Sequence, residues 1–376
     1  MNNKEVEIFH TIALTQIPKI GCITAQKLID TFGSATAVFQ LKKADLSTVD
    51  NIISDNIIKS ILSEKGLAFK IAEKEMAFII KNNITVFIKN DELFPKRLSH
   101  CLDAPLLLYG KGNLDLNPKR SVAIVGTRQY TEYGNKTTHQ IVETLSTYGN
   151  VQIVSGLATG IDTFAHQAAL KYGLSTLGVL GHGLQTIYPA GNKKLSISMQ
   201  EQGGLLSEYT SSTIGEAYNF PRRNRIIAGM ADAIIVVEAH AKGGALITAK
   251  IGFSYNRDVF AIPGKIGDKA SEGCNNLIKN NTAALITSAD DIIKMMMWDD
   301  NPPKKTEKTT QMRLLLDLTN EEQEIVQILQ EKEKLNIDEL LLTTSWNITT
   351  LSKILLTLEF KGIINCLPGK RYVLTI

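Results

Sequence analysis

The stretch Val122-Ala123-Ile124-Val125-Gly126-Thr127-Arg128 decides the fold, together with a second stretch of the same form that runs from Val151 to Asp162. Each begins as a short, almost continuous apolar run and then turns at a glycine. Three further runs share this form, and they are Ser175 to Gly181, Ala233 to Ala239 and Val259 to Gly264. Apolar runs of this length, separated by helical stretches, are typical of parallel strands that are covered on both faces. We therefore predict an α/β domain with a doubly wound parallel sheet, whose ligands bind beyond the carboxyl ends of the strands.

Length and composition indicate a globular chain with more than one domain. The 376 residues are 44% hydrophobic and 21% charged, which is enough apolar material for one large domain and one or two small ones. Lysine and arginine number 41 against 38 acidic residues, a formal net charge of +3. Because the chain as a whole carries no strong positive field, any nucleic-acid binding has to rest on local clusters of basic residues.

The positions of the cysteines and of the apolar runs indicate whether the protein binds a metal and in which compartment of the cell it works. The four cysteines lie far apart, and they are Cys22, Cys101, Cys274 and Cys366. This spacing indicates neither a zinc site nor a disulfide framework, so we expect no metal or other cofactor and a reducing, cytoplasmic environment. The N-terminus is polar, and the longest nearly apolar run, Ile226 to Ala239, contains two acidic residues. We therefore expect neither a signal peptide nor a membrane span.

The sequence divides into four segments. We predict a helical domain at residues 1–82, the α/β domain at 83–298, a linker at 299–318 and a winged-helix-like domain at 319–376. The linker is assigned from its clustered prolines and lysines, which are typical of exposed chain between domains.

The helical domain contains a pattern that resembles a helix-hairpin-helix. Ile17-Pro18-Lys19-Ile20-Gly21 is followed by the helical stretch Thr24 to Ile29 and then by Gly33, which is expected to end that helix. Glycine permits a tight turn, and exposed amides at the start of the next helix can hold a phosphate. The other interpretation, that the hairpin only packs a small helical bundle, stays equally open.

The last segment has the pattern of three helices and a hairpin, which together outline a winged helix. The assigned parts are a capping box at Thr319 to Glu322 before the first helix, a second helix at Ile337 to Leu342, an Asn347 cap on the third helix, and a hairpin of Ile363 to Leu367 with Tyr372 to Leu374. From Asp299 onward there are 12 acidic against 10 basic residues. This balance favours protein contact or packing over a strong grip on DNA.

The turns after the first two strands contain the parts of a phosphate cradle. Gly126-Thr127-Arg128 follows the first strand, and Ser155-Gly156 follows the second. Glycine lets the backbone approach an anion, while amides, hydroxyls and a helix N-terminus supply hydrogen-bond donors. A later loop, Lys242-Gly243-Gly244, either holds a second phosphate or allows close packing of helix and sheet. The GxGxxG fingerprint does not follow the first strand and GxxxxGK[ST] occurs nowhere, which disfavours a nicotinamide-cofactor enzyme and a P-loop ATPase.

The densest basic cluster is Phe220-Pro221-Arg222-Arg223-Asn224-Arg225. Arginine pairs with phosphate and stacks on bases, and a ring such as Phe220 can stack on a base of any identity. These are the parts of a groove for single-stranded nucleic acid. We also expect at least one of the three arginines to serve in an internal ion pair.

Candidate catalytic groups are few. They are Asp162, His166, Glu208, Glu216 and Glu238. An aspartate at a helix start is more often a cap than a general acid, and His166 is more often a hydrogen-bonded structural residue. No pair of nucleophile and base is identifiable, so we predict that the chain is not an enzyme.

Taken together, the motifs resemble the DNA-processing protein A family (DprA, also called Smf). The resemblance rests on Gly126-Thr127-Arg128, Ser155 to His166, Phe220-Pro221-x-Arg223-Asn224-Arg225 with Ile226 to Gly229, and Ala245 to Ala249, and it is extended by Val259 to Gly264 and Gly273 to Ile278. It covers roughly residues 84 to 295, and several motifs in order are far more specific than one motif alone.

The resemblance implies an extended Rossmann-like domain that acts as a recombination mediator without catalysis. Such proteins bind and protect single-stranded DNA, dimerise through this domain and help load RecA recombinase during natural transformation. The binding positions carried over would be Gly126-Thr127-Arg128, Ser155-Gly156 and Phe220 to Arg225. Three positions depart from the family pattern, which often has Ser at Thr127, Arg at Thr159 and an acidic residue at Gly191. The loss of a basic residue at Thr159 is expected to weaken one phosphate contact.

Two other functions stay open as alternatives. A Rossmann-type nucleotide phosphoribohydrolase would act on a nucleoside monophosphate, but its PGGxGT signature with a following catalytic glutamate is missing. A protein-interaction scaffold would keep the glycine loops without using them. Salt-dependent binding of single strands, against turnover of adenosine monophosphate, separates these possibilities.

Overall fold

Two parts of the chain fold as separate units in the computed structural model. The structure describes residues 2–41, 55–298, 318–332, 335–344, 346–367 and 371–374. Contacts divide the chain into Met1–Pro303 and Lys304–Ile376, and each unit is described by itself. The predicted linker at 299–318 lies outside the described residues apart from its last position.

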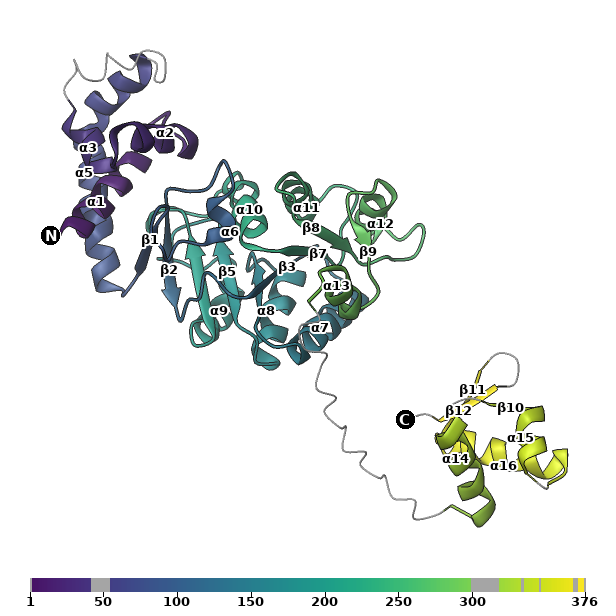
Figure 1. Cartoon of the computed structure of the whole chain (residues 1–376). Helices are drawn as coiled ribbons and strands as arrows, with labels where there is room; N and C mark the ends of the chain where they lie inside the picture. The colour runs from purple at the N-terminus through teal and green to yellow at the C-terminus, as the bar shows by residue number, and fades with distance from the viewer. Residues whose placement is uncertain are drawn as a thin grey trace. The chain divides into compact units, whose positions relative to one another are not determined.

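The first unit is built on a sheet that has nine strands within the described residues, in the order β1-β2-β6-β5-β4-β3-β7-β8-β9 (Figure 1). Neighbouring strands from β6 to β9 are parallel, and β1 and β2 extend the sheet as antiparallel strands. The chain runs from β3 outward to β6 and then returns to the other side of β3, so the strand order reverses there. Such a reversal opens a crevice at the carboxyl ends of the strands. The strands are β1 (Thr85–Ile88), β2 (Leu107–Gly112), β3 (Arg120–Val125), β4 (Val151–Ser155), β5 (Thr176–Leu180), β6 (Gly203–Ser207), β7 (Ala233–Val236), β8 (Asp258–Ala261) and β9 (Ala284–Leu285).

Helices cover both faces of this sheet (Figure 1). Alternate residues of β3 enter different cores, because Ala123 and Val125 pack beneath one helical layer and Val122 and Ile124 beneath the other. One layer contains α6 (Lys96–Ser99), α10 (Asn219–Met230), α11 (Gly244–Ser254) and α12 (Glu272–Lys279), and the other contains α7 (Glu132–Thr147), α8 (Ile161–Lys171), α9 (Lys193–Met199) and α13 (Ala289–Met295). The predicted doubly wound α/β fold is confirmed.

All five predicted strands are present, but the sheet contains four strands that were not predicted. These are β1, β2, β6 and β9. The β6 strand begins with two glycines, Gly203 and Gly204, which are poor strand formers when judged by propensity alone. It is a strand because an added Cβ at Gly204 would meet the Lys111 carbonyl oxygen of β2 at 2.3 Å, so the glycine permits close pairing.

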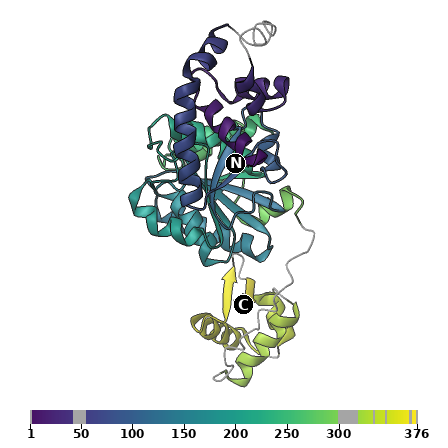
Figure 2. The ribbon, with the colours of Figure 1, turned by 90° about the vertical axis from the view of Figure 1, so that its left-hand side faces the viewer.

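The helical segment packs against the antiparallel edge of the sheet (Figure 2). Its helices are α1 (Asn3–Thr15), α2 (Cys22–Phe32), α3 (Ala35–Gln40) and α5 (Asp55–Lys81). Ile17 and Ile20 of the hairpin are buried in a core that also contains Leu107 and Tyr109 of β2. The predicted helix end at Gly33 is confirmed, with φ 92° and an N–H that donates to the Ile29 carbonyl. The hairpin therefore has the packing role, and its phosphate-binding role stays a prediction.

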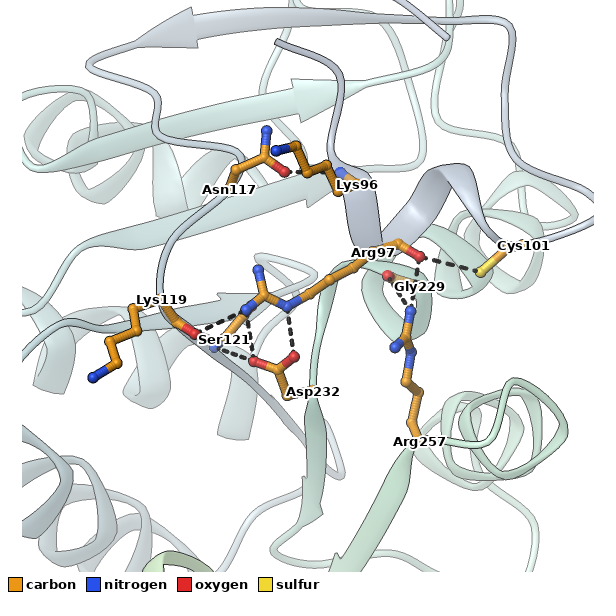
Figure 3. A network of polar contacts seen from close by, with 9 residues as sticks. All are labelled: Lys96, Arg97, Cys101, Asn117, Lys119, Ser121, Gly229, Asp232 and Arg257. Atoms are coloured by element: carbon orange, nitrogen blue, oxygen red, sulfur yellow. Dashed lines mark hydrogen bonds and ion pairs between the residues drawn. The ribbon is translucent and has the colours of Figure 1, made fainter. Parts of the chain in front are cut away.

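A polar network lies at the amino ends of β3 and β7, away from the crevice at the carboxyl ends of the strands (Figure 3). Asp232 accepts hydrogen bonds from Arg97 Nε at 2.6 Å, from Arg97 Nη2 at 2.9 Å and from the Ser121 amide at 2.9 Å. Arg257 donates to the Arg97 and Gly229 carbonyls. The network fastens α6 to the sheet and to the end of α10.

The second unit contains α14 (Asn320–Lys332), α15 (Ile337–Thr343) and α16 (Ile348–Phe360) with a sheet of order β10-β12-β11. Its strands are β10 (Leu335–Asn336), β11 (Ile364–Leu367) and β12 (Arg371–Leu374). Both predicted caps are confirmed, because Thr319 and Glu322 exchange hydrogen bonds and the Asn347 side chain accepts from the Thr350 amide at 2.9 Å. The winged-helix prediction holds, with β10 as an added strand that was not predicted.

Two further observations concern membrane spans and cysteines among the described residues. No helix among them is long and apolar enough to cross a membrane. None of the four cysteines, which all lie among the described residues, forms a disulfide bond.

Candidate nucleic-acid interface

A cavity of about 610 Å³ opens where the strand order reverses, and we call it the main pocket. It is lined by the turn after β3, by the segment after β7, and by residues from the first turns of α8, α10 and α11. Eight of the predicted site residues line it, and they are Gly126, Thr127, Arg128, Phe220, Arg223, Asn224, Gly243 and Gly244. Three helix N-termini lie around the cavity and supply positive partial charge, which suits an anionic ligand.

The floor of the pocket is a rigid turn after β4. Asp162 is 8% exposed, and its Oδ2 accepts hydrogen bonds from the Gly156 and Ala158 amides at 3.1 and 3.4 Å. Burial raises the pKa of Asp162, and the Arg223 guanidinium opposes that rise. At Gly160, φ is 83° and an added Cβ would lie 2.4 Å from the Thr127 carbonyl oxygen, so this glycine brings the two turns together. The predicted structural role of Asp162 as a partner of the helix start fits these contacts.

Arg223 supports the pocket from below. Its side chain is buried, and Nη1 donates to the Gly156 carbonyl at 2.7 Å and to the Val179 carbonyl. Burial lowers the pKa of Arg223 to about 10, so the guanidinium is still charged at neutral pH. The charge lies against the pocket and contributes to its field, although most of its donors are used within the protein.

Arg128 and two rings form the open rim. Arg128 is exposed, and its guanidinium carbon lies 5.6 Å from the centre of the Phe220 ring. Tyr188 also lines the rim, with its ring centre 5.6 Å from that of Phe220 and the planes inclined by 36°. A free guanidinium beside two aromatic faces offers both a phosphate contact and a stacking platform.

The start of α11 forms the opposite wall. Gly243 occupies the N-cap position with no side-chain hydrogen bond, and Gly244 begins the helix. An added Cβ at Gly244 would meet no atom within 4 Å, so the protein itself leaves this position open. Asn224 fastens the loop by donating to the Gly244 carbonyl at 3.3 Å.

Four predicted site residues lie outside the main pocket. Ser155 is fully buried and its hydroxyl donates to the Ile124 carbonyl at 2.6 Å. Gly156 lines a small side cavity of about 40 Å³ beneath Arg128 and Phe220. Arg222 and Arg225 line a separate cavity of about 270 Å³ beside the helical hairpin.

The α10 helix divides the basic cluster between the two cavities. Phe220, Arg223 and Asn224 face the main pocket, whereas Arg222 and Arg225, three residues apart, face the other side. Arg225 forms an ion pair with Glu208, and both side chains are largely buried. This confirms the expectation that at least one arginine of the cluster serves in an internal ion pair.

The pocket lining also contains residues that were not among the predicted site residues, and three of them have aromatic or basic side chains that can stack on a ligand or hydrogen-bond to it. They are Tyr188, His240 and Lys242. Tyr188 lies in an irregular segment with no periodicity to mark it, so the sequence offered no signal there. Lys242 belongs to the glycine loop that was recognised but was not named as a site residue, and His240 lies two residues before it, so proximity to that loop could have identified both.

The candidate catalytic groups have structural surroundings. His166 is fully buried with Nδ1 2.7 Å from the Thr176 hydroxyl, and burial lowers its pKa to about 3. Glu238 is 1% exposed and accepts from the Thr131 amide at 3.0 Å, while Glu216 is exposed. Among the described residues, no group of three or more His, Cys, Asp or Glu side chains could hold a metal ion.

Two positions that depart from the family pattern have clear locations. Thr159 is exposed and lines the small side cavity, so a basic side chain there would reach the same rim as Arg128. Asn192, which follows Gly191, donates to the Leu157 carbonyl at 2.9 Å and to the Thr163 hydroxyl at 2.8 Å. Asn192 therefore helps to hold the turn after β4.

Comparison with protein families gives two matches. The family described as DNA recombination-mediator protein A matches residues 85–297, and the DprA winged helix domain matches residues 309–370. The first match covers the whole α/β domain that forms the main pocket.

Individual proteins and structures agree with these matches. DNA processing protein DprA of Streptococcus pneumoniae is 45% identical over 189 residues, which are 50% of this chain and 66%, just under two thirds, of that relative. The X-ray structure of DprA from Streptococcus pneumoniae is similar with a TM-score of 0.66 and 34% identity, covering 78% of this chain and 98% of that one. A structure that addresses the single-stranded DNA binding mode of DNA processing protein A from Helicobacter pylori has a TM-score of 0.52 and 28% identity, covering 57% of this chain and 96% of that one.

Proposed function

The chain belongs to the DNA recombination-mediator protein A family, and on that premise we propose that it binds single-stranded DNA as a recombination mediator. The main pocket is the proposed binding site. The observation that carries the proposal is the combination of open helix-start amides at Gly243 and Gly244 with the exposed Arg128 beside Phe220 and Tyr188. The similar protein of Helicobacter pylori, whose single-stranded DNA binding mode was studied, supports the same ligand class.

These groups suit a single strand better than a duplex. Amides and a guanidinium contact phosphates, and rings stack on unpaired bases, but none of these contacts reads the edge of a base. A stacking platform is of no use to bases that stay paired within a helix. We therefore expect binding that prefers single strands and is independent of sequence.

The second proposal is that the protein works without catalysis and without a cofactor. Four of the five candidate catalytic groups are occupied, because Asp162 and Glu238 hold backbone amides, Glu208 pairs with Arg225 and His166 is buried against Thr176, whereas Glu216 is exposed. This disfavours the alternative of a phosphoribohydrolase, which needs a free carboxylate at the reacting atoms.

The partners follow from the same premise and are also proposals. We propose a homodimer formed through the α/β domain, contact with RecA recombinase, and a cytoplasmic role in protecting and loading incoming DNA during natural transformation. The second unit would serve protein contacts, because α16 contains a single lysine, Lys353, and Lys361 at its C-cap already pairs with Glu322 at 2.8 Å. We also keep the division at residues 82, 298 and 318 as the proposed domain boundaries.

The test compares the affinities of the protein for single- and double-stranded oligonucleotides of equal length over a salt series. Binding is measured by fluorescence anisotropy. Affinity for the single strand should be higher at every salt concentration and should fall steeply with salt, because each phosphate contact releases a counterion. Equal affinity for duplex would contradict the proposal. Turnover of adenosine monophosphate by the same preparation would favour the phosphoribohydrolase instead.

A further inference from the structure

A buried carboxylate on the helical segment contacts the chain segment that leads to the main pocket. Glu75 lies in α5 and is 4% exposed. Its two carboxylate oxygens each accept from the Ser211 amide at 2.9 Å, and Oε2 also accepts from the Ser211 hydroxyl at 2.6 Å. The two residues are 136 positions apart in the sequence.

This contact is expected to be strong. A buried carboxylate is costly unless it is hydrogen-bonded, and hydrogen bonds to a charged acceptor are stronger than those between neutral groups. The hydrogen bonds that the structure describes for the Glu75 carboxylate all come from Ser211. Burial raises the pKa of Glu75, and the Ser211 donors oppose that rise. The position of Ser211 is therefore coupled to that of α5.

Ser211 belongs to the segment 208–218, which connects β6 to α10 and which we call the wall segment. It contains turns and bends but no strand or helix. Hydrogen bonds within the segment, such as that from the Thr213 amide to the Thr210 carbonyl at 2.9 Å, and contacts with other elements hold its conformation. The Gly183 amide donates to its Thr213 carbonyl at 2.9 Å. Further along, Gly215 and Ala217 line the main pocket, and the segment leads directly into Phe220.

We propose that Glu75 is a positioning residue, through which the helical segment holds the wall segment in the conformation that binds single-stranded DNA. The proposal rests on the proposed function. It gives the helical segment a role in DNA binding that is separate from the packing role of its hairpin. Glu75 does not touch the pocket, so its effect on binding is transmitted through Ser211 and the residues that follow. By linkage, bound DNA should in turn stabilise the contact between Glu75 and Ser211.

The experiment measures affinity and local exchange on the full chain. Glu75→Gln removes the charge and one acceptor oxygen, and Ser211→Ala removes only the hydroxyl, so the second variant is the milder perturbation. Glu73→Gln is the matched control, because Glu73 is exposed on the same helix. Binding of a fluorescent thymidine oligonucleotide is measured well below the thermal midpoint of each variant, together with amide hydrogen exchange.

Glu75→Gln should weaken binding about fivefold or more, Ser211→Ala should weaken it less, and Glu73→Gln should leave it unchanged. Amides of the wall segment should exchange faster in Glu75→Gln, while those of β3 to β5 keep their rates. Unchanged affinity in a folded Glu75→Gln variant would overturn the proposal, as would faster exchange spread evenly over the first unit. If the unaltered protein binds no single strand, the proposed function fails, and the wall-segment exchange rates decide separately whether Glu75 positions that segment.

Discussion

The substitution Gly244→Ala separates ligand binding from stability at the main pocket. Gly244 is the first residue of α11, and a Cβ there would meet no protein atom within 4 Å. The backbone is not in the left-handed region, so alanine is compatible with it. Alanine also restricts the unfolded chain, which predicts a change in stability between zero and a gain of about 1 kcal/mol.

Although Gly244→Ala should keep or raise the stability of the protein, it should weaken the binding of single-stranded DNA. A phosphate oxygen held by an amide at the start of α11 would lie about 2.9 Å from that nitrogen, within the space that a new methyl group enters. Losing one hydrogen bond to a charged group costs about 1.5–3 kcal/mol, which corresponds to roughly a 10- to 150-fold weaker affinity.

The assay combines thermal unfolding with anisotropy titration of a short single strand. Gly66→Ala is the control, because Gly66 is exposed within α5 and an added Cβ there also meets nothing within 4 Å. It should match the stability effect and leave affinity unchanged. If Gly244→Ala binds the strand as tightly as the unaltered protein, the start of α11 is not a phosphate cradle and the reasoning is refuted.

Three further predictions concern the rim, the pH dependence and the network at the other end of the sheet. Arg128→Ala should weaken single-strand binding about tenfold with little change in the thermal midpoint, because its side chain is exposed; a large loss of stability with unaltered affinity would make it structural. The folded-state pKa of His166 lies near 3, below its ordinary 6.5, so its contribution to stability is present above pH 6.5 and is lost as pH falls. Between pH 7 and pH 5, chemical denaturation should show that the free energy of unfolding falls by about 2 kcal/mol more in the unaltered protein than in His166→Gln. Equal losses in the two proteins would contradict this prediction. Asp232→Ala leaves Arg97 Nε and the Ser121 amide without the Asp232 acceptor, although Arg97 Nη2 keeps the Lys119 carbonyl (Figure 3). Urea titration should therefore show that the free energy of unfolding falls by about 2 kcal/mol with single-strand affinity unchanged, and a loss below about 0.5 kcal/mol would mean that the network is not stabilising.

The central strands could be predicted from sequence because burial on both faces leaves a direct trace in composition. The runs at Val122 and Val151 are mostly apolar, and both lie in fully buried strands. The β6 strand left no such trace, since its glycines serve close pairing with β2 and only the neighbouring strand shows that need. The short β9 strand has two exposed residues and no core to mark it.

The site could be predicted in part for a related reason. The turn Gly126-Thr127-Arg128 follows β3 directly and the glycine loop at 243–244 lies between β7 and α11, so their location followed from the topology. The arginine cluster was treated as one surface, whereas helical spacing places Arg222 and Arg225 on the other side of α10 from Arg223. The contact of Glu75 with Ser211 joins segments that share no sequence pattern, so only the three-dimensional structure could reveal it.

Photochemical cross-linking tests the central claim most directly. A short single strand that carries 5-iododeoxyuridine is irradiated with the full chain, and the modified residues are identified by mass spectrometry. Stacking of bases at the main pocket predicts cross-links at Phe220 or Tyr188, and the loss of these cross-links in the Gly244→Ala variant. Cross-links confined to the helical hairpin or to residues beyond 318, with none at either ring, would contradict the account.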